Sequence, residues 1–346
     1  MGSAGMERAQ YSNTPVLQHS KNPMVPMKRE ADETELVREL KLIPGLKLKL
    51  SEPLARYTTM KIGGPADYFL DVETARALIE TLRLLGAHSL PLCLLGKGSN
   101  VLVSDLGVRG AVLRLGAEFK RISWREEGDQ ALVDVGSAYP VTQLVREAAR
   151  RGYSGLEFAE GIPGSVGGAL VMNAGAYGSE MEKIVERVEG VAFNGDPINL
   201  GRDEMVFTYR DSNLPSGTIV TAVRMRLQKR AAEEVGTKVR ELVVRRKTSQ
   251  PSGYPNSGSM FRNPPGDFAG RLIEAAGLKG RRIGGAEISN RHANFIVNLG
   301  GARAEDVRSL MELARREVKE RFGVELLPEV RWLGEWPSGA KDSREV

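Results

Sequence analysis

The stretch EGIPGSVGGALVMNAGAYG, from Glu160 to Gly178, holds six glycines in nineteen residues and carries no charge after its first residue. A glycine inside a helix or strand costs roughly 0.5–1 kcal/mol relative to alanine. A segment this rich in glycine must therefore gain stability elsewhere. It can do so by close approach of its backbone to a ligand, or by tight packing of one element on another, and this stretch alone leaves both interpretations open.

The first glycine turn along the chain, GKGSN at residues 96–100, follows the apolar run LPLCLL and precedes VLVSD, and the stretch at 160–178 is the second glycine loop. It is not a Walker loop, because Pro91 stands where that pattern needs a glycine. It is not a Rossmann fingerprint either, because a strand rather than a helix is expected after the glycines. A plain tight hairpin and an anion-binding nest of backbone N–H groups remain, and the residues alone favour the hairpin. Two such loops in one domain, however, favour a long nucleotide cofactor lying across both.

Composition limits the class of protein. The 346 residues suffice for two or three domains, and 41% hydrophobic and 27% charged residues are typical of a globular protein. The net charge of +5 suits an anionic small molecule. Its basic residues are interleaved with acids, so we predict no nucleic-acid partner.

The single cysteine, Cys93, excludes a disulfide framework and a cysteine-rich zinc site. We therefore predict no metal and a reducing compartment. No apolar run approaches the ~18 residues that would span a bilayer, and the N-terminus has no apolar core of a secretory signal. These features predict a cytoplasmic protein without membrane insertion.

Apolar spacing predicts helices at residues 32–43, 74–88, 140–152, 267–277 and 304–323, with short strands between them. Because helices and strands do not alternate regularly, the class expected is α+β. A charged helix runs into a Pro/Gly/Ser loop after residue 230, where we expect a domain boundary. The predicted divisions are a disordered tail at 1–33, a first domain at 34–230, a second at 231–336 and a C-terminal tail at 337–346.

Seven motifs, TTMKIGGPADYF, LGKGSNVLVSD, GLEFAEGIPGSVGGALVMNAGAYG, YRDS, GSMFRNP, HANFIVN and LPEVRW, occur in the order seen in the UDP-N-acetylenolpyruvoylglucosamine reductases. The chain resembles this family from about Leu50 to Trp332. These are flavoenzymes of bacterial peptidoglycan precursor synthesis. The resemblance implies an FAD-binding domain of the vanillyl-alcohol-oxidase (PCMH) type with two α/β subdomains, followed by a smaller α+β substrate-binding domain.

The resemblance also implies that both glycine loops hold FAD. The positions carried over are Gly96, Lys97, Gly98, Ser99, Asn100, Gly161, Ile162, Pro163, Gly164, Ser165, Gly168, Asn173, Ala174, Gly175 and Ala176. Covalent attachment of FAD would need a histidine or cysteine. The expected FAD domain contains only His88 and Cys93, both in or beside a predicted core strand. We therefore predict noncovalent FAD.

The implied reaction is NADPH-dependent reduction of UDP-N-acetylglucosamine enolpyruvate to UDP-N-acetylmuramate through FAD. In this resemblance Arg210 faces the substrate carboxylate, Ser259 delivers a proton, and Glu329 polarises the site or relays a proton. Taken singly, these residues would be a surface ion pair, a turn serine and an exposed strand-end carboxylate. Their joint occurrence in three matching motifs favours the catalytic interpretation.

Substrate contacts implied by the resemblance are Lys247, Arg262, Asn263, Asn294 and Arg331. Which residue of the Arg245-Arg246-Lys247 run meets the diphosphate stays open. Arg210 and Ser259 are 259 − 210 = 49 residues apart, so the chain resembles the shorter class of the family, without a tyrosine-bearing insertion. A monomer is favoured. The alternative function is another FAD-dependent oxidoreductase that acts on a different small substrate.

Overall fold

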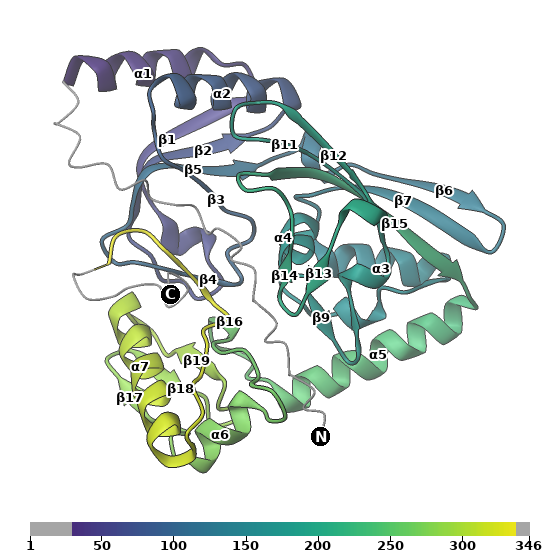
Figure 1. Ribbon diagram of the computed structural model, residues 1–346, viewed down its shortest axis with the longest axis vertical. Helices are drawn as coiled ribbons and strands as arrows, with labels where there is room; N and C mark the ends of the chain where they lie inside the picture. Colours follow the sequence, from purple (N-terminus) through teal and green to yellow (C-terminus); the bar gives the residue numbers. More distant parts are fainter. Residues whose placement is uncertain (1–29, 337–346) are drawn as a thin grey trace, which may run out of the picture.

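The computed structural model describes residues 30–336, and its first unit is a four-stranded sheet in the order β1-β2-β5-β3 (Figure 1). Strands β2, β5 and β3 are parallel, and β1 is antiparallel to β2. Helices α1 and α2 pack on this sheet through leucines such as Leu40, Leu78 and Leu82. The bounds are α1 (Glu30–Leu42), β1 (Leu46–Pro53), β2 (Pro65–Val72), α2 (Ala75–Ala87), β3 (Leu92–Leu94) and β5 (Val108–Leu115).

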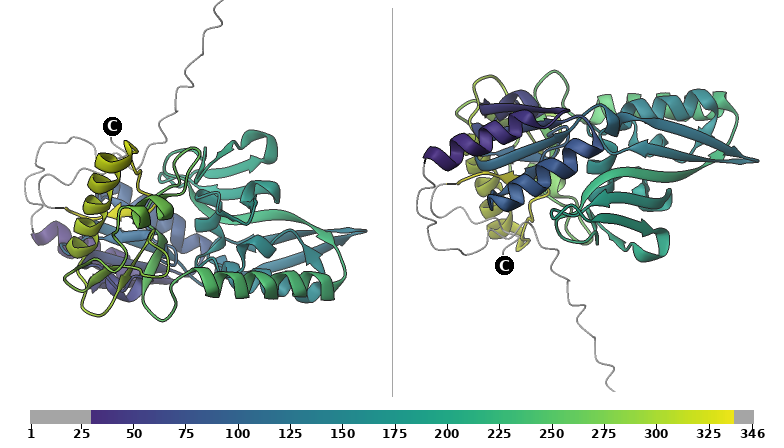
Figure 2. Two further views of the ribbon diagram at one scale, coloured as in Figure 1. Left: turned by 90° about the horizontal axis from the view of Figure 1, so that it is seen from below. Right: turned by 90° about the horizontal axis from the view of Figure 1, so that it is seen from above.

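The second unit is an antiparallel sheet in the order β12-β11-β15-β7-β6, with the short β8 paired to β15. One face packs on α3 and α4, where Val133 and Val135 meet Leu144 and Val145 in one apolar cluster. The β6–β7 hairpin projects from one end of the molecule (Figure 2). The bounds are β6 (Ile122–Glu127), β7 (Gln130–Gly136), α3 (Val141–Arg151), β8 (Tyr153–Ser154), α4 (Val166–Val171), β11 (Val185–Val191), β12 (Pro197–Gly201) and β15 (Ile219–Lys229).

The third unit is an antiparallel sheet in the order β16-β19-β18-β17, covered by α6 and α7. As the sequence predicts, α7 ends at a left-handed glycine, Gly323, with φ +69°. The bounds are β16 (Asn256–Ser259), α6 (Ala269–Ala275), β17 (Arg282–Ile283), β18 (Ala286–Ile288), β19 (Phe295–Asn298) and α7 (Ala304–Phe322).

Helix α5 (Ala232–Ser249) runs from the second unit to the third (Figure 1). Its Val235 and Val239 belong to the apolar core of the second unit. The division near residue 230 stays a prediction, and this packing favours a boundary at the far end of α5. Of the tail predicted for residues 1–33, the last four residues belong to α1. Residues 1–29 and the predicted C-terminal tail at 337–346 lie outside the described part of the chain.

The strand after the GKGSN turn does not form a hairpin, so that interpretation is wrong. β3 pairs with β5, whereas β4 (Val101–Val103) pairs in parallel with β20 (Arg331–Leu333). Figure 1 shows the C-terminal segment returning from the third unit to lie beside β4. The turn therefore carries the chain out of the first sheet toward the third unit, and the last strand closes against it.

Shorter elements complete the description, and the predicted α+β class is confirmed. They are β9 (Gly175–Ala176), β10 (Ser179–Glu180), β13 (Phe207–Thr208) and β14 (Asp211–Ser212), with 3₁₀ turns η1 (Leu54–Tyr57), η2 (Glu118–Lys120), η3 (Glu157–Ala159), η4 (Met181–Lys183) and η5 (Arg202–Glu204).

Candidate active site

Arg210 and Glu329 meet where the second and third units face each other. The Arg210 Nε lies 2.7 Å from the Glu329 Oε1, and the two side chains are only 22% and 12% exposed. Burial raises the pKa of the Glu329 carboxyl, and the charges of Arg210 and Arg262 oppose that rise without cancelling it. The fold thus brings together two of the three predicted catalytic residues as a largely buried ion pair.

The backbone of Arg210 adopts an unusual conformation. Residues 209 and 210 form the turn between β13 and β14, and Arg210 has φ +62°. A left-handed residue other than glycine costs of order 1 kcal/mol and is often found at functional sites. The Arg210 Nη1 also donates to the carbonyl of Gly175, 3.2 Å away. Arg210 therefore connects the second glycine loop to Glu329.

Ser259, the third predicted catalytic residue, lies in a segment whose backbone is hydrogen-bonded to that of Glu329. It ends β16 opposite Phe295 of β19. The carbonyl of the next residue, Met260, accepts from the Glu329 N–H at 2.8 Å. Ser259 and Glu329 are thus held in neighbouring segments by a direct backbone hydrogen bond.

The two glycine loops face each other. A Cβ added to Gly96 would lie 3.0 Å from the Ser165 Oγ, and one added to Gly164 would lie 3.4 Å from the Ser99 Oγ. Gly96 and Gly168 are exposed, so small uncharged groups from both loops form one surface. A flat cofactor can approach the backbone at Gly96 and Gly168, because neither residue carries a side chain. These residues fit FAD.

Close packing also explains part of the glycine content. Gly98 has φ +60°, and a Cβ there would lie 2.2 Å from the carbonyl oxygen of Tyr57. The neighbouring Thr59 N–H donates to the Gly98 carbonyl at 3.0 Å. Both interpretations of the glycine loops therefore apply, each to different positions.

The side chains of two predicted cofactor residues, Asn173 and Asn100, form hydrogen bonds within the protein. Asn173 is buried, with its Nδ2 donating to the Thr208 carbonyl at 3.2 Å and its Oδ1 accepting from the Glu182 N–H at 3.0 Å. Its side chain thus supports the strand that leads into the Arg210 turn. Asn100 donates from its Nδ2 to the carbonyl of Glu329 at 3.1 Å.

The predicted substrate residues fall into two groups. Asn294 is buried, and its amide is paired on both sides with the backbone of Phe261, at 3.0 and 2.8 Å. The Asn263 Oδ1 accepts from the Ala269 N–H at 3.1 Å and holds the start of α6. Arg262, by contrast, lies close enough to Glu329 to act on its pKa. Lys247 is exposed on the last turn of α5, and Arg331 begins β20.

The sequence left Arg246 open among three basic candidates, and Glu160 was not predicted as a site residue. The Arg246 Nη1 donates to the Glu160 carbonyl at 2.8 Å, and its Nε donates to the Gln250 Oε1 at 3.0 Å. Burial lowers the pKa of Arg246, and the Arg210 charge adds to that effect. Of the three basic residues at 245–247, Arg246 is the one whose side chain donates a hydrogen bond to the backbone of the glycine loop, whereas the Arg245 guanidinium lies over the Tyr177 ring of the same loop, 5.0 Å from its centroid. The available signal was the position of Glu160 as the only charge in that loop.

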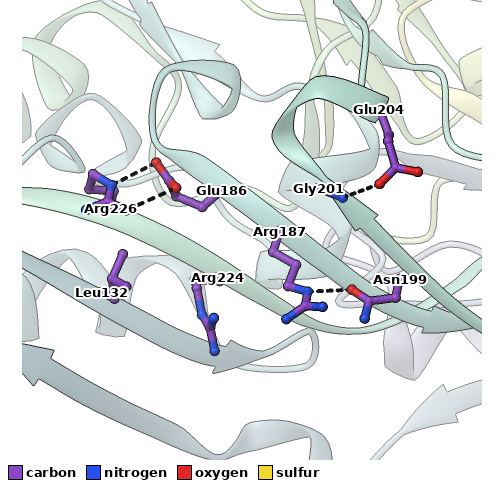
Figure 3. A pocket seen from close by; sticks show the side chains of 8 residues that line it. All are labelled: Leu132, Glu186, Arg187, Asn199, Gly201, Glu204, Arg224 and Arg226. Carbon is purple, nitrogen blue, oxygen red and sulfur yellow. Dashed lines mark hydrogen bonds and ion pairs between the residues drawn. The ribbon is translucent and has the colours of Figure 1, made fainter.

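A pocket of about 400 Å³ lies elsewhere, on the second sheet (Figure 3). Two of its three arginines pair with other residues of the lining, Arg226 with Glu186 and Arg187 with Asn199. The third, Arg224, pairs with Asp134. None of the predicted site residues lines it. Within residues 30–336 no helix is both long and apolar enough to cross a membrane.

Comparisons with known proteins agree with this arrangement. A family model described as "UDP-N-acetylenolpyruvoylglucosamine reductase, C-terminal domain" matches residues 250–333, and one described as "FAD binding domain" matches residues 66–201. The chain is 47% identical to UDP-N-acetylenolpyruvoylglucosamine reductase 2 of Symbiobacterium thermophilum, covering 88% of this chain and 97% of the relative. It is 45% identical to the reductase of Rubrobacter xylanophilus, covering 83% and 95%.

Among solved structures, the UDP-N-acetylenolpyruvylglucosamine reductase of Thermus caldophilus matches with a TM-score of 0.72 and 42% identity. The match covers 83% of this chain and 99% of the Thermus caldophilus chain. The predicted fold, an FAD-binding domain followed by a reductase-type C-terminal domain, is confirmed. The chain belongs to the UDP-N-acetylenolpyruvoylglucosamine reductase family.

Proposed function

We propose that this protein reduces UDP-N-acetylglucosamine enolpyruvate to UDP-N-acetylmuramate with NADPH, using noncovalent FAD. The observation that carries the proposal is the 2.7 Å contact between Arg210 and Glu329 beside the glycine loops. Through its second contact, with Gly175, Arg210 links residues 66–201, which match an FAD-binding domain, to Glu329 in residues 250–333, which match the reductase C-terminal domain. Bound FAD would supply hydride transfer between NADPH and the enolpyruvyl group.

Arg210 suits a substrate carboxylate on which negative charge develops. Its contacts with Glu329 and Gly175 occupy only part of a guanidinium that has five N–H donors. A planar donor fork matches a carboxylate better than an ammonium does. Because the site is largely buried, such a contact is stronger than it would be in water.

Ser259 and Glu329 have different roles in this proposal. The Ser259 hydroxyl delivers a proton to the carbon next to the one that receives hydride, which requires a site poor in water and a strongly basic acceptor. The Glu329 carboxylate, in its ionised form, orients Arg210. The ion pair at 2.7 Å supports that choice over a role for Glu329 as proton relay.

The cofactor contacts come from the two glycine loops, and attachment is noncovalent. Burial raises the pKa of the Cys93 thiol to about 11, so the thiol is not ionised near neutral pH. We further propose that the protein acts as a monomer in the cytoplasm, where a free cysteine such as Cys93 stays reduced.

The test is a visible absorption spectrum of the purified protein, recorded anaerobically. We expect a yellow protein that bleaches with NADPH and regains its colour on addition of UDP-N-acetylglucosamine enolpyruvate. A protein that bleaches but recovers only with a different acceptor would support another flavin oxidoreductase. A protein that cannot be loaded with FAD would contradict the proposal as a whole. Denaturation in acid should release all of the flavin if attachment is noncovalent.

A further inference from the structure

Both backbone polar groups of Glu329 are bound to segments from different parts of the chain. Its N–H donates to the Met260 carbonyl at 2.8 Å, next to Ser259. Its carbonyl accepts from the Asn100 Nδ2 at 3.1 Å, in the first glycine turn. With the side-chain contact to Arg210, Glu329 thereby connects three separate segments.

Asn100 is fixed at the point where β4 and β20 come together. Its own carbonyl accepts from the Arg331 N–H at 3.0 Å, and the two strands pair from Arg331↔Val101 onward. Asn100 therefore contacts the residues at positions 329 and 331 from two sides. The backbone between them has little freedom to move away from the glycine turn.

We propose that Asn100 is a positioning residue that holds the Glu329 carboxylate against Arg210 and couples the cofactor turn to the reaction centre. The proposal rests on the role proposed above for Glu329. The Asn100 amide is directed to Glu329 and, weakly, to the Met172 Sδ at 3.7 Å. In this proposal the backbone of the turn contacts the cofactor, and the Asn100 side chain positions Glu329.

Geometry explains why this hydrogen bond matters. Glu329 lies two residues before β20, and Pro328 before it has no N–H to donate. A displacement of the Glu329 backbone by about 1 Å would lengthen and misalign the 2.7 Å contact with Arg210, and misplacements of that size can cost on the order of 100-fold in rate. Holding the carbonyl from the cofactor side prevents such a displacement.

The test is a double-mutant cycle between Asn100→Ala and Glu329→Gln in the FAD-loaded protein. The rate measured is reoxidation of the reduced protein by UDP-N-acetylglucosamine enolpyruvate. We expect Asn100→Ala to slow that step about 10-fold and to leave reduction by NADPH nearly unchanged, and we expect Asn100→Ala to add little to Glu329→Gln. Multiplicative effects of the two substitutions would overturn the proposal. If Glu329→Gln alone had no effect, the role proposed for Glu329 would fail instead.

Asn298→Ala is the matched control. Asn298 is buried, and, like the half-buried Asn100, it donates from its Nδ2 to a backbone carbonyl distant in the sequence, that of Met60 at 3.0 Å. Its effect should multiply with that of Glu329→Gln, as expected for independent sites. Asn100→Asp retains the shape of the side chain but removes its donor, and it should reproduce the coupling of Asn100→Ala. Loss of FAD from both Asn100 variants would assign the residue to cofactor binding and overturn the proposal.

Discussion

Arg210 and Glu329 form an ion pair at 2.7 Å between a strained turn of the second unit and the segment that leads into β20, the last strand of the chain. The pair is largely buried, so neither charge is fully stabilised by water. Its formation depends on docking of the third unit. The proposed catalytic centre therefore assembles only when the units are correctly placed relative to one another.

Replacing Glu329 by glutamine should slow reoxidation of the reduced protein by the enolpyruvyl substrate about 10²–10³-fold, because Arg210 loses the charge that orients it. Reduction by NADPH should change much less. Stopped-flow absorbance measures both steps. A variant that loses the two half-reactions equally would contradict a role confined to the second step.

The raised pKa of Glu329 predicts a dependence of stability on pH. The ordinary pKa is 4.5, and burial holds the folded value above it. Below the unfolded pKa the carboxyl is neutral in both states and imposes no cost. As pH rises through 4.5, the carboxyl ionises first in the unfolded state, so the free energy of unfolding falls. It stops falling once the carboxyl of the folded state has also ionised. Glu329→Gln removes that loss.

Urea unfolding of the wild type and the glutamine variant, followed from pH 4 to 8, measures this effect. The free energy of unfolding of the variant minus that of the wild type should increase with pH above 4.5 and then level off. A difference that decreases over this range would show that Arg210 lowers the pKa more than burial raises it.

Local sequence patterns predicted much of this arrangement. The 3.6-residue spacing of apolar residues located α2, α3 and α7, and the glycines located both loops. The pairing of β4 with β20 could not be predicted, because the two strands are far apart in the sequence. The hydrogen bond from Asn100 to Glu329 beside them joins residues 229 positions apart. No local pattern encodes such a partner, and adjacent strands wrongly suggested a hairpin.

Local sequence also does not show which way a side chain near the site will point. Lys247 matched the family motif, yet Arg246 is the neighbour that turns inward, since the rotation of α5 decides which face meets the glycine loop. Asn294 also matched a motif, but its amide is paired with Phe261. A motif identifies a position near a site, and packing decides whether the side chain faces the ligand.

Ser259→Ala should leave flavin reduction by NADPH nearly intact and slow reoxidation by the substrate, because only the second step requires a proton. Ser257→Ala is the matched control, since Ser257 lies on the same strand with its hydroxyl near the Val101 carbonyl, 3.5 Å away. Both variants are measured by single-turnover absorbance. A slow second step in both, or in neither, would count against Ser259 as the proton donor.

Arg246→Ala should lower the free energy of unfolding by about 1.5–3 kcal/mol, the range for a hydrogen bond from a charged group, because the Glu160 carbonyl loses its donor. FAD affinity should fall as well, since that carbonyl adjoins Gly161. Arg245→Ala is the control, because Arg245 is exposed and contacts the loop only through the Tyr177 ring, so its loss should change stability by no more than about 1 kcal/mol. Chemical unfolding and flavin titration measure the two effects. Equal effects of both substitutions would contradict an inward role for Arg246.

Gly98→Ala should prevent the first glycine turn from closing. Gly98 has φ +60°, and the new Cβ would lie 2.2 Å from the backbone oxygen of Tyr57, which cannot move aside as a side chain can. Gly128 provides a matched control, because it has φ +59° in the β6–β7 turn with open space around it. Gly128→Ala should cost only the backbone strain, about 1 kcal/mol, and should leave FAD content unchanged. Gly98→Ala should cost more and release FAD, as measured by thermal unfolding and the flavin-to-protein absorbance ratio. If the two variants behaved alike, the contact with Tyr57 would not explain the glycine at position 98.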